Sequence, residues 1–220
     1  MPRISGNRPA RKFATGVFIN CPFDAKYKPL FDCLIFTTIY CGYLARSALE
    51  IDDGSQVRIE KIFQIIQESQ FGIHDLSRTE LDKSSKLPRF NMPLELGVFL
   101  GAKRFGKGAQ KRKYCLILDR SEYRYQKFIS DISGQDIRAH NRSTVEVITI
   151  VRNWLRSSSQ RSLPGGAEIC RQYRAFSRAL PTLCRQLQLK PTEMTFNDFT
   201  NVVTQWLKER IELKRKVARN

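Results

Sequence analysis

The feature that most constrains the fold is a repeated alternation between short apolar runs and longer stretches with helical periodicity. The apolar runs have the length of buried strands and are bounded by polar turns. They cover residues 16–20, 43–49, 71–77 and 113–119, and a further short strand is expected around 136–139. Strands that alternate with helices predict a parallel sheet with helices on both faces. The sequence therefore indicates an α/β protein.

Helical spacing defines the remaining segments and the expected division of the chain. Helices are expected over 30–42, 57–69, the segment that carries Glu95, part of 120–135, and 144–157. A linker is expected at 158–166. After it, proline and polar residues that typically separate helices favour three further helices, near 167–179, 181–189 and 196–215. We expect a disordered basic arm (1–15), an α/β domain (16–157) and a helical C-terminal region (158–220).

Charge indicates anionic partners. The 220 residues carry a formal net charge of +17. Such a charge attracts polyanions and anionic small molecules alike, although solvated basic surfaces are an equally open interpretation. Three clusters concentrate it: Arg3, Arg8, Arg11 and Lys12; Lys103, Arg104, Lys107, Lys111, Arg112 and Lys113; and Lys208, Arg210, Lys214, Arg215, Lys216 and Arg219.

Cysteine usage and hydropathy bear on the compartment. The six cysteines form no CxxC pair and have no metal-ligand spacing with His74 or His140, and several lie in apolar runs. They indicate reduced thiols in a cytoplasmic protein. No apolar run reaches membrane-spanning length, so we expect a soluble, intracellular chain without a membrane partner or a metal site.

One edge of the expected sheet gathers polar residues. In open parallel sheets, ligands bind beyond the carboxyl ends of the strands. The residues just past the strands are 20–24, 50–58, 75–78, the loop that leads to Asn91, and 119–120. A Gly-Ser turn at Gly54 and Ser55, after Asp53 and before a helix, is a candidate anion seat. Neither a dinucleotide fingerprint nor a P-loop is present.

Glu95 is the residue whose interpretation matters most. Pro93 suits the first helical position, which makes Asn91 or Met92 the cap and puts Glu95 in the first turn. There it either complements the helix dipole or is directed into a pocket. Purely structural roles are also open for the other candidate residues, since Asp75 could cap a turn and His74 could be a buried core histidine.

Three segments resemble, in order and spacing, the nucleoside 2-deoxyribosyltransferase-like enzymes and their bacterial TIR-like relatives. The segments read VFINCPFD, FGIHDLS and NMPLELGVFLGAKRF, and the resemblance covers about residues 16–140. It implies a flavodoxin-like parallel sheet of about five strands. It also implies that Glu95 attacks or stabilises the anomeric carbon, that Asp75 is its polar partner, and that 20–24 is the sugar-binding loop. Where those transferases place D-x-G-T, Asn91 is the obvious polar substitute.

The expected function follows from the resemblance and the residues together. We expect an N-glycosidic bond hydrolase or transferase that uses NAD or a nucleotide as substrate, needs no cofactor, and acts as a homo-oligomer in bacterial defence. The candidate catalytic residues are Glu95 and Asp75, and the candidate substrate-binding residues are Asn20, Pro22, Phe23, Asp24, Asp53, Gly54, Ser55, Arg58, Ser77, Arg78 and Asn91. A non-catalytic nucleotide sensor that signals through the C-terminal helices, and a nucleic-acid-associated protein that binds through its basic arm and tail, are the alternatives.

Overall fold

The computed structural model describes residues 13–79, 81 and 89–217 of the chain, with the side chains of 214–217 excepted. Most of the expected disordered arm therefore lies outside the described residues. Its last three residues, 13–15, form a helical turn. The carbonyl of Phe13 accepts a hydrogen bond of 3.1 Å from the N–H of Gln70, which joins this turn to the body of the protein.

Five parallel strands form one sheet in the order β2-β1-β3-β4-β5, which is the flavodoxin-like arrangement expected from the sequence. β1 pairs with both β2 and β3, and β4 joins β3 to β5. The second and third strands are shorter than expected, because their last residues turn into the loops of the sheet edge. The strands are β1 (Gly16–Asn20), β2 (Leu44–Arg46), β3 (Phe71–Asp75), β4 (Tyr114–Asp119) and β5 (Ile137–Ala139).

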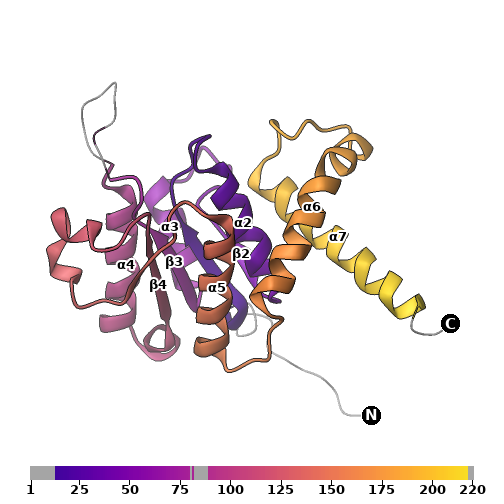
Figure 1. The fold of residues 1–220 in the computed structure, drawn as a ribbon. Helices are drawn as coiled ribbons and strands as arrows, with labels where there is room; N and C mark the ends of the chain where they lie inside the picture. The colour runs from indigo at the N-terminus through magenta and orange to yellow at the C-terminus, as the bar shows by residue number, and fades with distance from the viewer. Residues whose placement is uncertain (1–12, 80, 82–88, 218–220) are drawn as a thin grey trace, which may run out of the picture.

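Helices cover both faces of this sheet (Figure 1). Successive residues of a strand point to opposite faces. Val17 and Ile19 accordingly pack with the helices on one side of β1, whereas Phe18 packs on the other side. The first side holds α2 (Lys28–Tyr40) and α5 (Thr144–Ser159), and the second holds α3 (Arg58–Gln67) and α4 (Asn91–Phe105).

The α3–α4 side depends on a close approach at Gly72. A Cβ atom at this position would lie 2.7 Å from the ring of Phe99 and 2.8 Å from Nε2 of His74. Both rings are fully buried, and they meet edge to face at 5.0 Å between centroids. Glycine therefore allows α4 to pack directly against β3.

The segment between β4 and β5 differs from the expected helix. It contains two short 3₁₀ helices, η2 (Arg124–Lys127) and η3 (Ser130–Ile132), and Tyr123 before them has a left-handed φ of 55°. The contacts of the Arg124 guanidinium explain why this segment forms a loop and not a regular helix. It donates to Asp119 at 2.8 Å and also reaches the carbonyl of Leu76, so the loop folds around Arg124.

The C-terminal region contains two helices where three were expected. α6 (Gly166–Gln186) continues through Pro181, and α7 (Phe196–Val217) follows. The proline is exposed, and the buried residues Phe176 and Cys184 on either side keep the helix packed across it.

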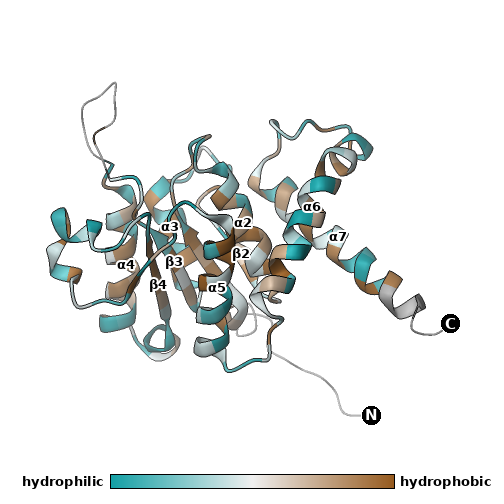
Figure 2. Cartoon of the chain, in the orientation of Figure 1, coloured by the Kyte–Doolittle hydropathy of each residue, from teal (hydrophilic) through white to brown (hydrophobic). Residues whose placement is uncertain are grey.

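Both C-terminal helices pack against α2 and share its core. The ring of Phe36 lies 5.3 Å from that of Phe176 on α6 and 6.1 Å from that of Trp206 on α7, centroid to centroid. Figure 2 shows the same arrangement, with apolar residues gathered on the strands and on the helix faces turned toward them. No helix in the described part of the chain has the length and apolarity required to cross a membrane.

Candidate active site

The strand ends meet at one edge of the sheet, as the sequence predicts. Because the strands are parallel, Asn20, Arg46, Asp75 and Asp119 end β1 to β4 on the same side, and His140 directly follows β5. Each of these five residues is at most 5% exposed. Buried polar groups are costly unless they have partners, so their contacts determine what this edge can do.

Asp75 is the centre of a buried hydrogen-bond network. Its Oδ2 accepts from the hydroxyl of Tyr27 and lies 3.0 Å from Nε2 of His140, and its Oδ1 accepts from the N–H of Ser77 at 2.8 Å. Burial alone would raise the pKa of Asp75, but the hydrogen bonds from His140, Ser77 and Tyr27 outweigh it and lower that pKa. Asp75 is therefore an ionised group whose contacts suit an organising role.

His140 is held in one tautomer by its own loop. The N–H of Arg142 donates to Nδ1 at 3.0 Å, so the ring proton lies on Nε2. Nε2 faces both Asp75 and, at 2.9 Å, the Oγ of Ser77. A serine-hydrolase relay needs the serine and the carboxylate on opposite ring nitrogens. The three residues therefore do not form such a relay.

Glu95 is a buried carboxylate with a different environment. It lies on α4 and is 6% exposed. Burial raises its pKa to about 7, and the nearby guanidinium of Arg58 opposes this rise. No hydrogen bond or ion pair joins Glu95 to another residue within 13–79, 81 and 89–217. A buried carboxylate without donors is a candidate functional group.

The thiol of Cys21 shows that the predicted carboxylates converge. Burial raises the pKa of Cys21 well above its usual value, and the charges of Asp75, Glu95 and Asp24 raise it further. Electrostatic coupling of this kind requires proximity inside the protein. The structure thus brings Glu95 and Asp75 around one residue just past β1.

The position of Glu95 in its helix differs from the expected one. α4 begins at Asn91, so Pro93 is its third residue and Glu95 its fifth, and the first turn has no acidic residue. The expectation that Pro93 occupies the first position is wrong because the first N–H groups of a helix have no intrahelical partner, so proline is tolerated there too. Glu95 lies beyond the first turn, where dipole compensation is weak. Asn91 itself is exposed.

Asn20 positions α4 through its side chain. Its Nδ2 lies 3.0 Å from Nδ1 of His74 and donates to the carbonyl of Met92 at 2.9 Å. Burial, and secondarily the charge of Lys113, lowers the pKa of His74 to about 3, so this histidine is a neutral core residue. Asn20 thereby ties β1 and β3 to the start of the helix that carries Glu95.

The loop after β1 faces the C-terminal helices. Pro22 is buried, whereas Phe23 is 39% exposed and packs edge to face against Phe31 at 5.3 Å. With Asp24 they line a cavity of about 220 Å³ that also reaches the start of α7. An ion pair of 3.4 Å joins Asp24 to Arg78, and so links this loop to the one after β3.

The predicted anion seat after β2 lies at the periphery. Asp53 accepts the N–H of Ser55 at 2.9 Å and its hydroxyl at 2.7 Å, which closes the turn on itself. Gly54 and Ser55 are exposed. Arg58 is also exposed, yet its charge acts on Glu95. Among these four residues, the structure connects Arg58 to the site.

A cavity of about 290 Å³ lies at the site edge, between the starts of α2 and α5. Ser77 and Arg78, two of the candidate substrate-binding residues, line it. Tyr27, His140 and Arg142 also line it and were missed by sequence reasoning. The position of His140 and Arg142 just past β5 was a usable signal. Tyr27 offered none, because its partner is 48 residues away.

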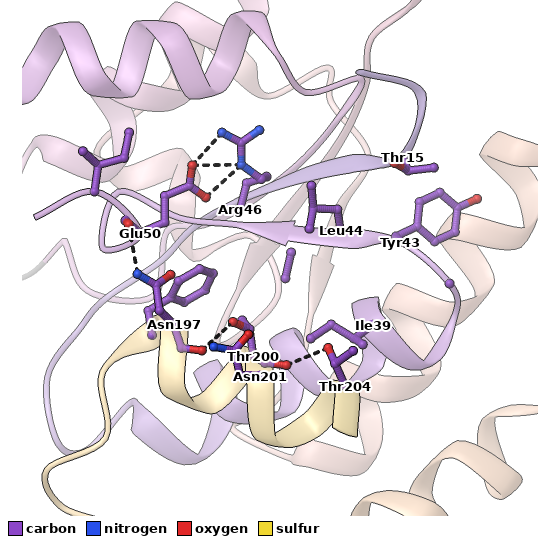
Figure 3. Close-up of a pocket in the computed structure, with 14 residues that line it drawn as sticks. Thr15, Ile39, Tyr43, Leu44, Arg46, Glu50, Asn197, Thr200, Asn201 and Thr204 are labelled. Carbon is purple, nitrogen blue, oxygen red and sulfur yellow. Dashed lines mark hydrogen bonds and ion pairs between the residues drawn. The ribbon is translucent and has the colours of Figure 1, made fainter. Parts of the chain in front are cut away.

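A larger cavity, of about 620 Å³, lies beside the edge strand β2 and the first half of α7 (Figure 3). Glu50 lines this cavity, and its carboxylate accepts a hydrogen bond of 2.8 Å from Arg46. The amide of Asn197 donates to the carbonyl of Glu50, and the hydroxyl of Thr200 donates within α7. Arg46, Glu50, Asn197 and Thr200 are therefore hydrogen-bonded within the protein, whereas the buried hydroxyl of Tyr43, which also lines this cavity, has no hydrogen-bond partner among the described residues.

The middle basic cluster lies away from the strand-end edge. The first, at 3–12, lies outside the described residues. The middle one, at 103–113, connects the end of α4 to the start of β4, at the opposite edge of the sheet. Within it, Lys113 is buried and donates to the carbonyls of Ile66 and Ser69, and burial lowers its pKa to about 8.

The described residues contain no group of three or more His, Cys, Asp or Glu side chains placed to hold a metal ion. The six cysteines form no disulfide. Comparison of the chain with family models, curated proteins and solved structures finds no match.

Proposed function

We propose that the chain cleaves or transfers the N-glycosidic bond of a nucleotide or of NAD, with Glu95 as the reacting carboxylate. The observation that supports this most is the burial of Glu95 at the strand-end edge without a hydrogen-bond donor from the described residues. A negative charge in such a place is poorly stabilised by the protein and gains most from a positively charged carbon. The resemblance of the E-L-G segment to glycosyl-transferring enzymes points to the same residue.

The chemistry requires one carboxylate near the anomeric carbon. The bond between C1′ and the base nitrogen breaks, and its electron pair leaves with the base. The carboxylate of Glu95 stabilises the oxocarbenium-like C1′ or forms an ester with it. Water or an acceptor hydroxyl then bonds to C1′ and releases a proton. Nicotinamide leaves neutral because its ring nitrogen is cationic before cleavage, whereas a purine must gain a proton.

The other buried groups hold this arrangement in place. Asp75 fixes the loop after β3 through Ser77 and His140, and it fixes the start of α2 through Tyr27. Asn20 fixes the start of α4. Reacting groups must be positioned within a fraction of an ångström, which is the contribution that such supporting contacts make.

The proposal gives the reaction a defined pH dependence. Glu95 must be ionised to stabilise a cation, and its pKa is raised to about 7. kcat/KM should therefore increase as the pH rises from 5.5 to 8.5, with a midpoint near 7.

Base release is the direct test. The purified protein, at high concentration, is incubated with NAD, nucleotides or deoxynucleosides, and the released base is followed by chromatography. Glu95→Gln should reduce release by at least about 100-fold, while its circular dichroism spectrum stays unchanged. Glu122→Gln makes the same change at an exposed carboxylate and should have no effect. Equal release by the Glu95→Gln protein would refute the assignment.

A nucleotide sensor is the second candidate, and one contact favours it. Phe23, in the loop after β1, packs on Phe31, which stacks on Phe196 at the start of α7. Occupancy of the site could thus be transmitted to the C-terminal helices. No base release from any substrate, with equally tight nucleotide binding by the wild type and Glu95→Gln, would favour this function over the enzyme.

A further inference from the structure

We infer that the cavity between the starts of α2 and α5 is a subsite for a phosphate monoester, the 5′-phosphate of a nucleotide. The identity of the whole ligand rests on the proposed function, whereas the phosphate site rests on the cavity itself. The polar residues that line it are Lys26, Tyr27, Ser77, Arg78, His140, Arg142 and Thr144.

Charge is the first reason. Three cationic side chains, Lys26, Arg78 and Arg142, line the cavity, and no carboxylate among the residues that the structure describes does. Lys26 and Arg142 are exposed and have no ion pair among the described residues. Arg78 reaches Asp24 only at 3.4 Å, so its remaining donors are available to an anion.

Helix position is the second reason. The cavity lies against the starts of α2 and α5, which are 13 and 16 residues long. The positive ends of two helix dipoles therefore point at the same space. Ser143 caps α5 through Glu146 N–H, and Thr144, the first residue of that helix, lines the cavity.

Ser77 and His140 form a fixed part of the cavity wall. Because Nδ1 of His140 accepts from the N–H of Arg142, the ring donates through Nε2, which lies 2.9 Å from the Oγ of Ser77 and 3.0 Å from Oδ2 of Asp75. The side chain of Ser77 also forms a hydrogen bond with Asp75, and this bond lowers the pKa of that carboxyl. Ser77 and His140 are both nine-tenths or more buried, so this part of the wall is in place before a ligand binds.

The loop that carries Arg142 is already in place. Asn141 and Arg142 both have left-handed backbone conformations, with φ of 48° and 59°. Two contacts hold them: Asn141 donates to Glu146 at 2.9 Å, and the N–H of Arg142 donates to His140. Arg142 is thus presented by an ordered turn, which reduces the cost of binding.

Size limits the ligand. Cavities that hold a whole drug-sized molecule span roughly 300–1,000 Å³, and this one measures about 290 Å³. It can take a phosphate and part of a sugar, whereas the base must lie outside it. Ser77 and Arg78 lie two and three residues after Asp75, the last residue of β3, so a phosphate here would place the attached sugar over the strand ends.

Matched ligands test the inference without turnover. In a Glu95→Gln background, isothermal titration calorimetry at constant ionic strength compares adenosine 5′-monophosphate, adenosine and inorganic phosphate. We expect the monophosphate to bind at least about 10-fold more tightly than adenosine. Arg142→Gln, which keeps the backbone N–H that orients His140, should remove this difference and leave adenosine unaffected. Arg156→Gln, at an exposed arginine near the end of α5, should change neither.

The outcomes separate this inference from the proposed function. Equal affinity for the monophosphate and adenosine, no monophosphate binding at millimolar concentration, or an unchanged affinity in Arg142→Gln would overturn the phosphate subsite. Inorganic phosphate that binds as tightly as the monophosphate would overturn its assignment to a nucleotide. Arg142-dependent binding of the monophosphate without base release from any substrate would support the subsite and count against the enzyme.

Discussion

Asp75 and Glu95 are two buried carboxylates at the same sheet edge, and they differ in how their charge is compensated. Asp75 is not exposed at all and has three donors, which lower its pKa despite burial. Glu95 is 6% exposed, and no donor joins it within the described residues; its pKa is raised to about 7. Ionised Asp75 therefore stabilises the fold, whereas ionised Glu95 destabilises it. Such a difference distinguishes a group used for architecture from one kept available for a ligand.

The largest effect is expected at the compensated carboxylate. Asp75→Asn keeps the size of the side chain but removes the charge that Tyr27, Ser77 and His140 solvate. Breaking a buried charged network costs about 3–5 kcal/mol, so the free energy of unfolding in urea at pH 7 should fall by that amount.

The pH dependence of this loss has a definite sign. The native pKa of Asp75 is depressed, so its contribution is present above the unfolded value of about 3.9 and is lost as the pH falls through the native pKa. The difference between the wild type and Asp75→Asn should shrink below pH 4. Asp136→Asn, at an exposed carboxylate paired with Arg138, should cost at most about 1 kcal/mol. Equal losses for the two variants would contradict the comparison.

The opposite sign is expected at the uncompensated carboxylate. Because the native state raises the pKa of Glu95 from 4.5 to about 7, it binds the proton more tightly than the unfolded chain. Stability is therefore lost as the pH rises through this window. Glu95→Gln removes the penalty and should stabilise the protein by about 2–3 kcal/mol at pH 8, with no gain at pH 4. Urea denaturation at both pH values measures this, and destabilisation at pH 8 would show that Glu95 has a native partner.

The difference between the two carboxylates could be predicted only in part from the sequence. Strand periodicity and the rule that parallel strands end together placed Asp75 and Glu95 at one edge. Their environments depend on contacts between distant segments, such as those of Tyr27 with Asp75 and of Ser77 with His140, across 48 and 63 residues. No local pattern encodes such pairs. The hydrogen bonds of Ser55 to Asp53 close the turn after β2, and the composition that suggests an anion seat does not reveal these contacts.

The smallest effect concerns one of the three donors to Asp75. The pKa of Tyr27 is raised well above its usual value, by burial and by the charge of Asp75, so its hydroxyl is a protonated donor at neutral pH. Tyr27→Phe deletes this hydrogen bond without leaving a cavity, and Ser77 and His140 remain. A hydrogen bond to a charged group contributes roughly 1.5–3 kcal/mol, and we expect the lower value because two donors persist.

Acid denaturation sharpens this last prediction. With one donor fewer, the native pKa of Asp75 should rise toward its ordinary value, so the Tyr27→Phe protein should begin to unfold at a higher pH than the wild type. Tyr125→Phe is the matched control, because its hydroxyl donates only to a neutral carbonyl, that of Ser133, at 3.3 Å. If both variants lose the same stability at neutral pH and unfold at the same acidic pH, the Tyr27 contact contributes nothing to the charge of Asp75. The contrast with Glu95 would then depend on Ser77 and His140 alone.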